Sequence, residues 1–230
     1  MPYSDSSFDP LISKLLRRWA YHYYLDVGPG AGKYARLIRQ QFPNARIEAL
    51  EPDRSYVRRF NLGQMYDAIA IASARQIVDG HPSYHTECAI VGDSIEHMTK
   101  SEGTDLLHYL VYRSKTILVV FPNRYIQYSW EGHAGEAHRS AWARGDFRDF
   151  THRWHTKGYM RLAVIDGYLS YRDAVIERAT ANSLRQHPSI TAWLPAKIRR
   201  FTRVLTRAKG SASRRRSRKT ARKSSRTGSN

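Results

Sequence analysis

Short apolar runs alternate along the first half of the chain with segments whose apolar residues recur at helical spacing. The apolar runs predict buried strands at 21–27, 45–51, 66–72, 87–93 and 115–121. The spaced segments predict helices at 11–19, 32–42, 53–62 and 100–114, with a short helical turn at 74–78. Strands that are apolar on both faces and alternate with helices are typical of a parallel sheet covered by helices on both sides.

The pattern changes after residue 123. The segment 143–159 predicts a helix, and the segment 159–179 alternates apolar and polar residues about a central Asp166-Gly167, which is a signal for a β-hairpin. The expected architecture is therefore α/β, with a seven-stranded, mostly parallel sheet that finishes in a C-terminal antiparallel hairpin and carries helices on both faces.

Positive charge is concentrated near the C-terminal end of the sequence. Fourteen of the 38 Lys and Arg residues lie in 195–230, a stretch without acidic residues, so the first 194 residues carry 24 basic and 20 acidic residues, a net charge of +4. We expect a lead-in helix at 1–20, the main domain at 21–180, a basic amphipathic helical segment at 181–208 and a disordered basic tail at 209–230. The tail predicts binding to nucleic acid, RNA above all, with an anionic membrane surface or a purely solubilising role as alternatives.

The remaining composition bears on the cellular compartment. Cys88 is the only cysteine, which excludes an intrachain disulfide and a cysteine-based zinc site. The first 20 residues lack the basic-then-apolar layout of a signal peptide, and no apolar run is long enough to cross a bilayer. These features predict a soluble, cytoplasmic protein without a transmembrane segment.

A glycine-rich stretch follows the first predicted strand and admits three interpretations. A P-loop, G-x-x-x-x-G-K-[ST], would place its first glycine on Val27 and its hydroxyl residue on Tyr34, so both positions fail. A dinucleotide-binding loop, G-x-G-x-x-G, would place its third glycine on Lys33. The third pattern, D-x-G-x-G-x-G, is matched at every position.

That third pattern consists of Asp26, Gly28, Gly30 and Gly32, and it resembles motif I of the class I S-adenosylmethionine-dependent methyltransferases. The glycines allow a tight turn from strand to helix and a close approach of the backbone to a ligand. The resemblance implies a Rossmann-like methyltransferase fold, S-adenosylmethionine as the cofactor, and a place for Asp26 near the methionine ammonium group.

Two further positions extend the resemblance. Glu51 ends the second predicted strand, where the family has an acid that binds both ribose hydroxyls. After the third strand many relatives have an Asp that meets the adenine amino group, whereas this sequence has Ser73 and Ala74. The resemblance implies that Ser73 and Ala74 contact adenine through hydroxyl or backbone groups.

A polar cluster follows the fourth predicted strand. Asp93, Glu96 and His97 stand at the carboxyl end of that strand, where open α/β sheets bind their ligands, and His138 follows in the irregular stretch. Because a methyl group on a sulfonium is already activated, an enzyme mainly aligns the acceptor and removes its proton. Asp93, which also counts as a cofactor-binding residue, His97 and His138 are therefore the catalytic candidates.

The same cluster resembles two groups within the family. The pattern D-x-x-E-H, then P-N, then H-R-S-x-W and D-F resembles a broad group of small class I enzymes that act on sugars and other small molecules. It also resembles the small-RNA 3′-terminal 2′-O-methyltransferases, which implies a divalent metal, Mg²⁺ or Mn²⁺, on Asp93, Glu96, His97 and His138. Zn²⁺ suits such donors about equally. A metal-free role for the two histidines, in general base catalysis or in substrate positioning, is favoured over the metal.

The sequence thus predicts an S-adenosylmethionine-dependent methyltransferase that acts on a hydroxyl or an amine, with RNA as the favoured acceptor. The Asn/Asp-Pro-Pro-aromatic loop of nucleobase amino methyltransferases is absent, which disfavours base N-methylation. The alternatives are a small-molecule or glycan methyltransferase with an incidental tail, and a non-catalytic nucleic-acid-binding module on the same fold. Trp130, His133 and Trp142 fall in the part of this fold that forms the substrate lid, although core packing explains them equally well.

Overall fold

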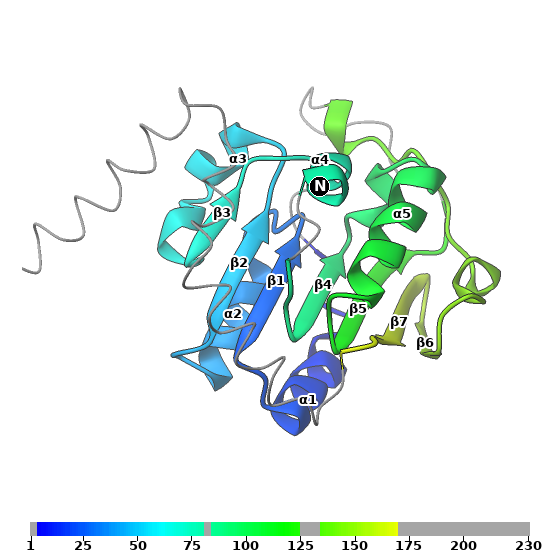
Figure 1. The fold of residues 1–230 in the computed structure, drawn as a ribbon, viewed down its shortest axis with the longest axis horizontal. Coiled ribbons are helices and arrows are strands. Elements are labelled where there is room, and N and C mark those ends of the chain that lie inside the picture. Colours follow the sequence, from blue (N-terminus) through cyan, green and yellow to red (C-terminus); the bar gives the residue numbers. More distant parts are fainter. Residues whose placement is uncertain (1–3, 81–83, 125–133, 170–230) are drawn as a thin grey trace, which may run out of the picture. The chain divides into compact units, whose positions relative to one another are not determined.

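The computed structural model describes residues 4–80, 84–124 and 134–169, in which helices and strands alternate (Figure 1). The helices are α1 (Asp9–Trp19), α2 (Lys33–Gln41), α3 (Arg54–Arg59), α4 (Ala74–Gly80) and α5 (Lys100–Val111). The strands are β1 (Tyr23–Val27), β2 (Arg46–Leu50), β3 (Ala68–Ala70), β4 (Cys88–Gly92), β5 (Thr116–Pro122), β6 (His152–Lys157) and β7 (Met160–Asp166). Short 3-10 helices lie at Leu62–Gln64, Ile95–His97, Ala134–Glu136 and Arg144–Phe147.

The strands form one seven-stranded sheet in the order β3-β2-β1-β4-β5-β7-β6. The first five strands pair in parallel, whereas β7 runs antiparallel to β5 and β6 runs antiparallel to β7. This arrangement confirms the predicted fold class. It also brings the carboxyl ends of β1, β2 and β4 together at one edge of the sheet (Figure 1).

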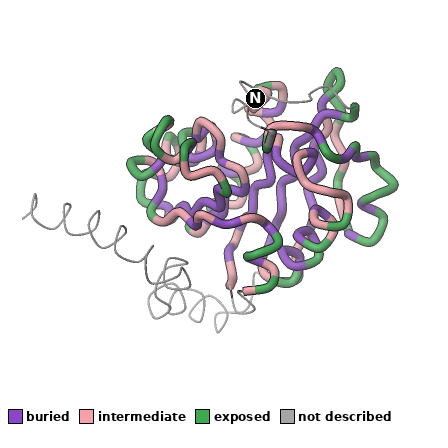
Figure 2. Tube along the Cα trace, turned by 90° about the horizontal axis from the view of Figure 1, so that it is seen from above, coloured by how far each residue is buried: buried purple, intermediate pink, exposed green. Residues whose placement is uncertain are grey.

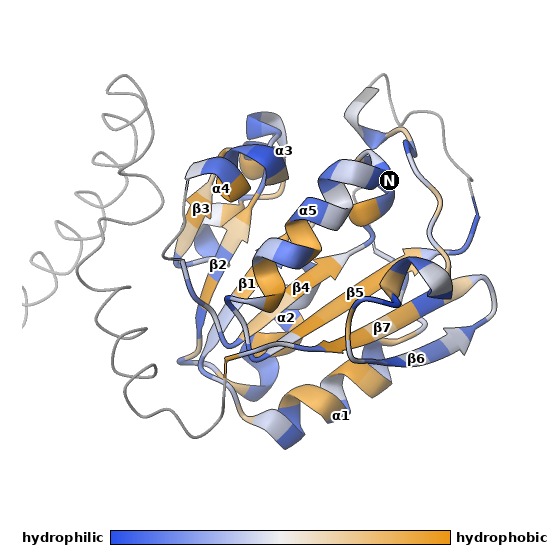
Figure 3. Cartoon of the chain, turned by 45° about the vertical axis from the view of Figure 1, so that its right-hand side comes forward, coloured by the Kyte–Doolittle hydropathy of each residue, from blue (hydrophilic) through white to orange (hydrophobic). Residues whose placement is uncertain are grey.

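The sheet is buried because helices cover both of its faces. Every residue of β4 and β5 is buried, and the strands form the buried centre of the molecule (Figure 2). On one face, Ile12 and Leu16 of α1 and Ile38 of α2 belong to the same core cluster as Ile90 and Leu118. Helices α4 and α5 lie on the other side of the sheet from α1 (Figure 3). Strands that are apolar on both faces are therefore explained by two helical layers.

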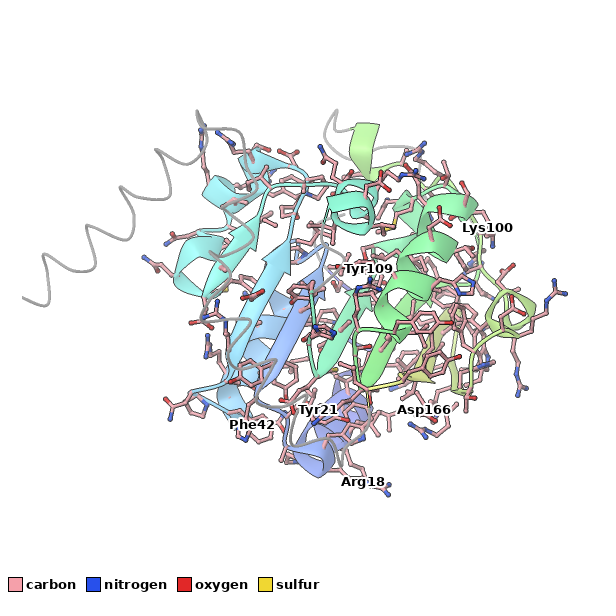
Figure 4. All side chains as sticks on the ribbon, in the orientation of Figure 1. Arg18, Tyr21, Phe42, Lys100, Tyr109 and Asp166 are labelled. Atoms are coloured by element: carbon pink, nitrogen blue, oxygen red, sulfur yellow. The ribbon has the colours of Figure 1, made fainter. Side chains whose placement is uncertain are left out.

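Local signals fix where several elements begin and end. Thr99 and Glu102 form a capping box at the start of α5, and the Asp53 side chain accepts a hydrogen bond from Ser55 N–H at the start of α3. Tyr21 lies at the amino end of the sheet (Figure 4), where its hydroxyl and the Thr116 hydroxyl are 3.2 Å apart and hydrogen-bonded. This bond joins the chain just before β1 to β5.

One helix prediction in the C-terminal part is wrong. Residues 143–159 form a 3-10 helix at Arg144–Phe147 and then strand β6, not an α-helix. The ring of Trp154 on β6 lies 5.6 Å from the ring of Phe147 and 5.9 Å from that of Phe121. These aromatic contacts and the pairing with β7 override the helical pattern of the isolated segment.

The C-terminal hairpin exists, but it lies one strand earlier than predicted. Strands β6 and β7 are joined at Gly158, whose φ is +57°. Asp166-Gly167 ends β7 instead, and Gly167 N–H donates to Lys115 C=O at 2.9 Å. A Cβ at Gly167 would stand 1.9 Å from the Ser114 carbonyl oxygen, so this glycine permits a close backbone contact.

Some predictions fall on parts of the chain outside the described residues. These are the second half of the predicted hairpin, the amphipathic segment 181–208 and the basic tail 209–230. In the described part of the chain, no helix has both the length and the apolar character needed to span a membrane.

Gly92, the last residue of β4, provides a test of the packing between β4 and α2. A Cβ at this position would lie 2.0 Å from Cε2 of the buried Tyr34 ring. We expect Gly92→Ala to destabilise the fold by roughly 2–3 kcal/mol, because Tyr34 is enclosed by the core and has no room to move. Urea unfolding would measure the change. Gly63→Ala is the matched control, since nothing lies within 4 Å of its Cβ, and equal stability of the two variants would contradict this packing.

Candidate active site

The glycine turn after β1 is held in a conformation that requires glycine. Gly28, Gly30 and Gly32 have φ values of +70°, +50° and +80°. A Cβ on Gly28 would lie 2.6 Å from the Cβ of Ser94, whose hydroxyl donates to Val27 C=O at 2.9 Å. The turns after β1 and β4 therefore touch.

A pocket of about 290 Å³ lies beside these turns. Seven of the predicted site residues line it, namely Gly28, Gly30, Glu51, Ser73, Ala74, Asp93 and His97. Other lining residues were not predicted from the sequence, among them Ser4, Pro52, Tyr56, Met98, Glu136 and Arg139. Asp26, Gly32, Glu96 and His138 lie outside the set of lining residues.

Glu51 presents a buried carboxylate to the pocket. Its side chain follows β2, is 4% exposed, and accepts a hydrogen bond from Asp53 N–H at 2.8 Å on Oε1. Burial raises the pKa of Glu51 to about 7, and the Asp53 N–H opposes this shift. A polar ligand that donates hydrogen bonds to the ionised carboxylate would compensate for its burial.

Asp26 does not line the pocket. It is fully buried, and its Oδ2 accepts a hydrogen bond from the Tyr66 hydroxyl at 2.5 Å. Burial raises the pKa of Asp26 to about 7, while the Tyr66 hydrogen bond and the charge of Lys33 lower it. Gly32, the N-cap of α2, is likewise not a lining residue. The proximity of Asp26 to the methionine ammonium therefore stays a prediction.

Ser73 and Ala74 line the pocket at the start of α4. The Ser73 N–H already donates to Gln76 Oε1 at 2.8 Å, and Gln76 N–H donates to the Ser73 hydroxyl at 3.3 Å. Their contact with adenine stays a prediction, and the neighbouring Arg75 side chain is a further polar group at this end of the pocket.

Asp93 occupies an unusual backbone position directly after β4. Its φ is +50°, in the left-handed region that few residues other than glycine, Asn and Asp adopt. Its Oδ2 accepts a hydrogen bond from Asp5 N–H at 3.2 Å. Burial raises the pKa of Asp93 to about 7, and the charge of Lys33 opposes the shift.

Three of the four predicted metal ligands form one cluster. Glu96, His97 and His138 each offer a ligand atom, and these atoms all lie within 4.8 Å of one another. The segment after the 3-10 helix Ala134–Glu136 is fixed there because Arg139 N–H and Ser140 N–H donate to Glu96 C=O at 2.7 and 3.1 Å. Asp93 is not in the cluster, so the structure does not place it with the other three predicted ligands.

Protonation in this cluster is governed by burial. Burial raises the pKa of Glu96 well above its usual range, and the charge of Asp93 adds to the shift. Burial also lowers the pKa of His97 below its usual value, and burial together with the nearby His97 lowers the pKa of His138 to about 4. The two rings lie edge to face, with centroids 5.0 Å apart, and His97 Nδ1 is 3.2 Å from Ala137 C=O. Both imidazoles are therefore neutral at neutral pH.

Glu96, His97 and His138 offer donor atoms of the kind that a divalent cation binds. A buried Glu96 Oε2 has no hydrogen-bond partner among the described residues, so a positive charge would satisfy it. A neutral imidazole whose second nitrogen bonds a backbone carbonyl is the common state of a metal-bound histidine. The same neutral rings can equally accept a proton from an acceptor group without a metal.

Trp142 belongs to the core rather than to a lid. It is 2% exposed, its Nε1–H donates to the Ser140 hydroxyl at 2.8 Å, and its ring lies 5.7 Å from the ring of Phe147. The Lys100 ammonium stands 4.1 Å from the centre of the same ring. Trp130 and His133 lie outside the described residues.

Neither a model of a known protein family nor a curated protein sequence matches this chain. Solved structures do match. An O-methyltransferase family protein from Burkholderia thailandensis aligns with a TM-score of 0.51 at 12% identity, over 70% of this chain and 55% of that one. The methyltransferase domain of the bacterial protein CtHen1-C aligns with a TM-score of 0.53 at 15% identity, over 70% of this chain and 97% of that one. The N-terminal domain of EvdMO1 with SAH bound aligns with a TM-score of 0.51 at 12% identity, over 71% of this chain and 82% of that one.

These likenesses show the fold: the chain shares the seven-stranded, Rossmann-like fold of these methyltransferase structures. The match to the Burkholderia protein spans about half of that protein's length.

Proposed function

We propose that this protein is an S-adenosylmethionine-dependent methyltransferase that transfers a methyl group to a hydroxyl or an amine. The observation that carries the proposal is the pocket at the carboxyl edge of the sheet, which joins the glycine turn to the buried Glu51 carboxylate. In open α/β sheets the ligand lies at this edge. Gly28 and Gly30 would hold the amino-acid end of the cofactor through their backbone, and Glu51 would hold the ribose hydroxyls. The cofactor would supply an activated methyl group.

The residues beside the pocket suit the second half of the reaction, which is removal of a proton from the acceptor. His97 lines the pocket, and the ring of His138 packs edge to face against the ring of His97. Both rings are neutral at neutral pH, so each has a free base to offer a hydroxyl or an amine. His97 is the stronger candidate for the base, because the pKa of about 4 makes the His138 ring a weak one. Asp93 lines the same region, where an ionised carboxylate would orient an acceptor group.

A second role for the cluster is favoured by the 4.8 Å grouping of Glu96, His97 and His138, which would hold a divalent cation. A cation there would supply positive charge that lowers the pKa of an acceptor hydroxyl. Two imidazoles and one carboxylate suit Mn²⁺ better than Mg²⁺, because imidazole is a softer donor than oxygen.

RNA is the proposed acceptor class. The support is the sequence of the basic tail, which would concentrate the enzyme on a polyanion, together with the resemblance of the cluster to small-RNA 2′-O-methyltransferases. Methyl incorporation into total RNA, measured with and without residues 209–230, tests this. We expect incorporation that falls when the tail is removed and that becomes less dependent on salt.

The alternatives predict different results in the same assay. Methylation of a carbohydrate extract with none in RNA would favour a small-molecule or glycan methyltransferase. A protein that binds nucleic acid but gives no heat when titrated with S-adenosylmethionine would be a non-catalytic module on this fold.

A further inference from the structure

A segment that precedes β1 in the sequence forms part of the pocket wall. Asp5 N–H donates to Asp93 Oδ2 at 3.2 Å, and Ser4 is a lining residue of the pocket. Phe8 is 4% exposed and belongs to the core cluster between α1 and the sheet, so its side chain anchors the segment to the core. The chain's own Ser4–Asp9 segment therefore contacts the Asp93 carboxylate from one side of the pocket.

Lys33 holds this segment from the side of the glycine turn. It is the first residue of α2, directly after Gly32. Its Nζ donates to Asp5 C=O at 2.5 Å and forms an ion pair with Asp9 Oδ1 at 2.9 Å. The Lys33 and Asp9 side chains are only 16% and 23% exposed, so solvent screens the pair weakly. Charged hydrogen bonds of this kind are stronger than neutral ones.

A second lysine reaches the same segment from the hairpin. Lys157 Nζ, at the end of β6, donates to Ser7 C=O at 3.1 Å. Ser7 N–H in turn donates to Asp5 Oδ1 at 2.7 Å, which closes a local turn. The segment is thus tied to α2, to the turn after β4 and to the hairpin, although these elements are distant in sequence.

We propose that Ser4–Asp9 is a wall of the active-site pocket and that Lys33 is the positioning residue that fixes this wall over Asp93. The inference rests on the proposed function, because the wall encloses the cofactor pocket. Lys33 joins the wall to the glycine turn, so a ligand held by Gly28 and Gly30 meets one continuous surface. Such a wall excludes water from the side of the pocket where Asp93 lies.

The test compares Lys33→Met with Lys14→Met, a lysine-to-methionine change at an exposed position of α1. For Lys33→Met we expect amide hydrogen exchange at Asp5–Asp9 to accelerate about tenfold or more, with exchange in β4 and β5 unchanged. We expect its Kd for S-adenosylhomocysteine, measured by calorimetry, to rise about tenfold. Lys14→Met should change neither quantity, and Lys33→Arg should restore most of both, because arginine keeps the charge and the donors.

The localised exchange change separates a positioning role from a general loss of stability. If Lys33→Met is destabilised throughout, Asp9→Asn decides, because it removes one charge of the pair and keeps the shape. Unchanged exchange at Asp5–Asp9 in whichever variant stays folded would overturn the inference. If the wild-type protein does not bind S-adenosylhomocysteine, the proposed function is wrong. The exchange data would still show whether Lys33 fixes the position of Ser4–Asp9.

Discussion

Replacing Glu51 with glutamine is expected to raise the Kd for S-adenosylhomocysteine at least about tenfold at pH 8, because two hydroxyl donors would lose a charged acceptor. Glutamine keeps the size of the side chain and one acceptor oxygen, so the loss reports charge rather than shape. Isothermal titration calorimetry measures the change. Glu48→Gln is the matched control, since Glu48 is a buried acid of β2, the strand that Glu51 follows, and does not line the pocket.

The pH dependence of this binding follows from the raised pKa of Glu51, about 7 in the free protein. A ribose that donates to the carboxylate favours its ionised form, so the pKa falls on binding and a proton is released. Affinity should therefore rise about tenfold from pH 6 to pH 8 and level off above that. Asp26, whose pKa is also about 7, contributes in the same direction if it meets an ammonium group. Glu51→Gln should show a shallower rise, and an unchanged slope with unchanged affinity would contradict the ribose role.

The stability of the free protein should move in the opposite direction. Because the pKa of Glu51 is higher in the folded chain than in the unfolded one, the folded state holds this proton more tightly. The stabilisation is fully present below the unfolded pKa and is lost as the pH rises through about 7. Glu51→Gln should thus melt higher than wild type at pH 8, which would show that its weaker binding does not come from misfolding.

The sequence predicts the part of this fold that depends on short-range pattern. The parallel strands are apolar on both faces, and the helices between them carry caps such as Asp53 and Thr99, so both are visible in a single sequence. Strand β6 was missed because it is an edge strand, with charged residues such as Arg153 facing outward. Its identity as a strand comes from pairing with β7 and from the contact of Trp154 with Phe147, which no local pattern encodes.

The candidate site divides in the same way. Residues directly after parallel strands, such as Glu51 and Asp93, can be predicted as site residues from their position in the sequence alone. The reason is that the carboxyl ends of parallel strands meet at one edge of the sheet, where ligands bind. Ser4 and Arg139 reach the pocket from segments whose path depends on tertiary hydrogen bonds, such as Arg139 N–H to Glu96 C=O. The separation of Asp93 from Glu96, His97 and His138 accompanies its φ of +50° and its hydrogen bond from Asp5, and residue spacing in the sequence reveals neither of these features.

Addition of about 1 mM Mn²⁺ is expected to raise the melting temperature of the wild-type protein by several degrees, since a ligand that binds only the folded state stabilises it. The expected site is the cluster of Glu96, His97 and His138, whose ligand atoms lie within 4.8 Å of one another. Burial disfavours the charged form of the Glu96 carboxyl, and a bound cation would stabilise that charge. Glu96→Gln and His138→Ala should each abolish the shift. His108→Gln, a change at an exposed histidine of α5, should leave it intact.

Activity distinguishes the two proposed roles of this cluster once an acceptor is in hand. If the cation is required, chelation should remove methyl transfer and Mn²⁺ should restore it, and His97→Ala should lower the rate at least about a hundredfold. If the histidines act without a cation, the rate should survive chelation but fall to a similar extent in His138→Ala, because the neutral ring no longer accepts the acceptor's proton. Chelator-insensitive methyl transfer together with a fully active His138→Ala variant would exclude the cation. A His97→Ala variant that is also fully active would exclude the metal-free role, and the buried Glu96 carboxyl would then be explained by protonation alone.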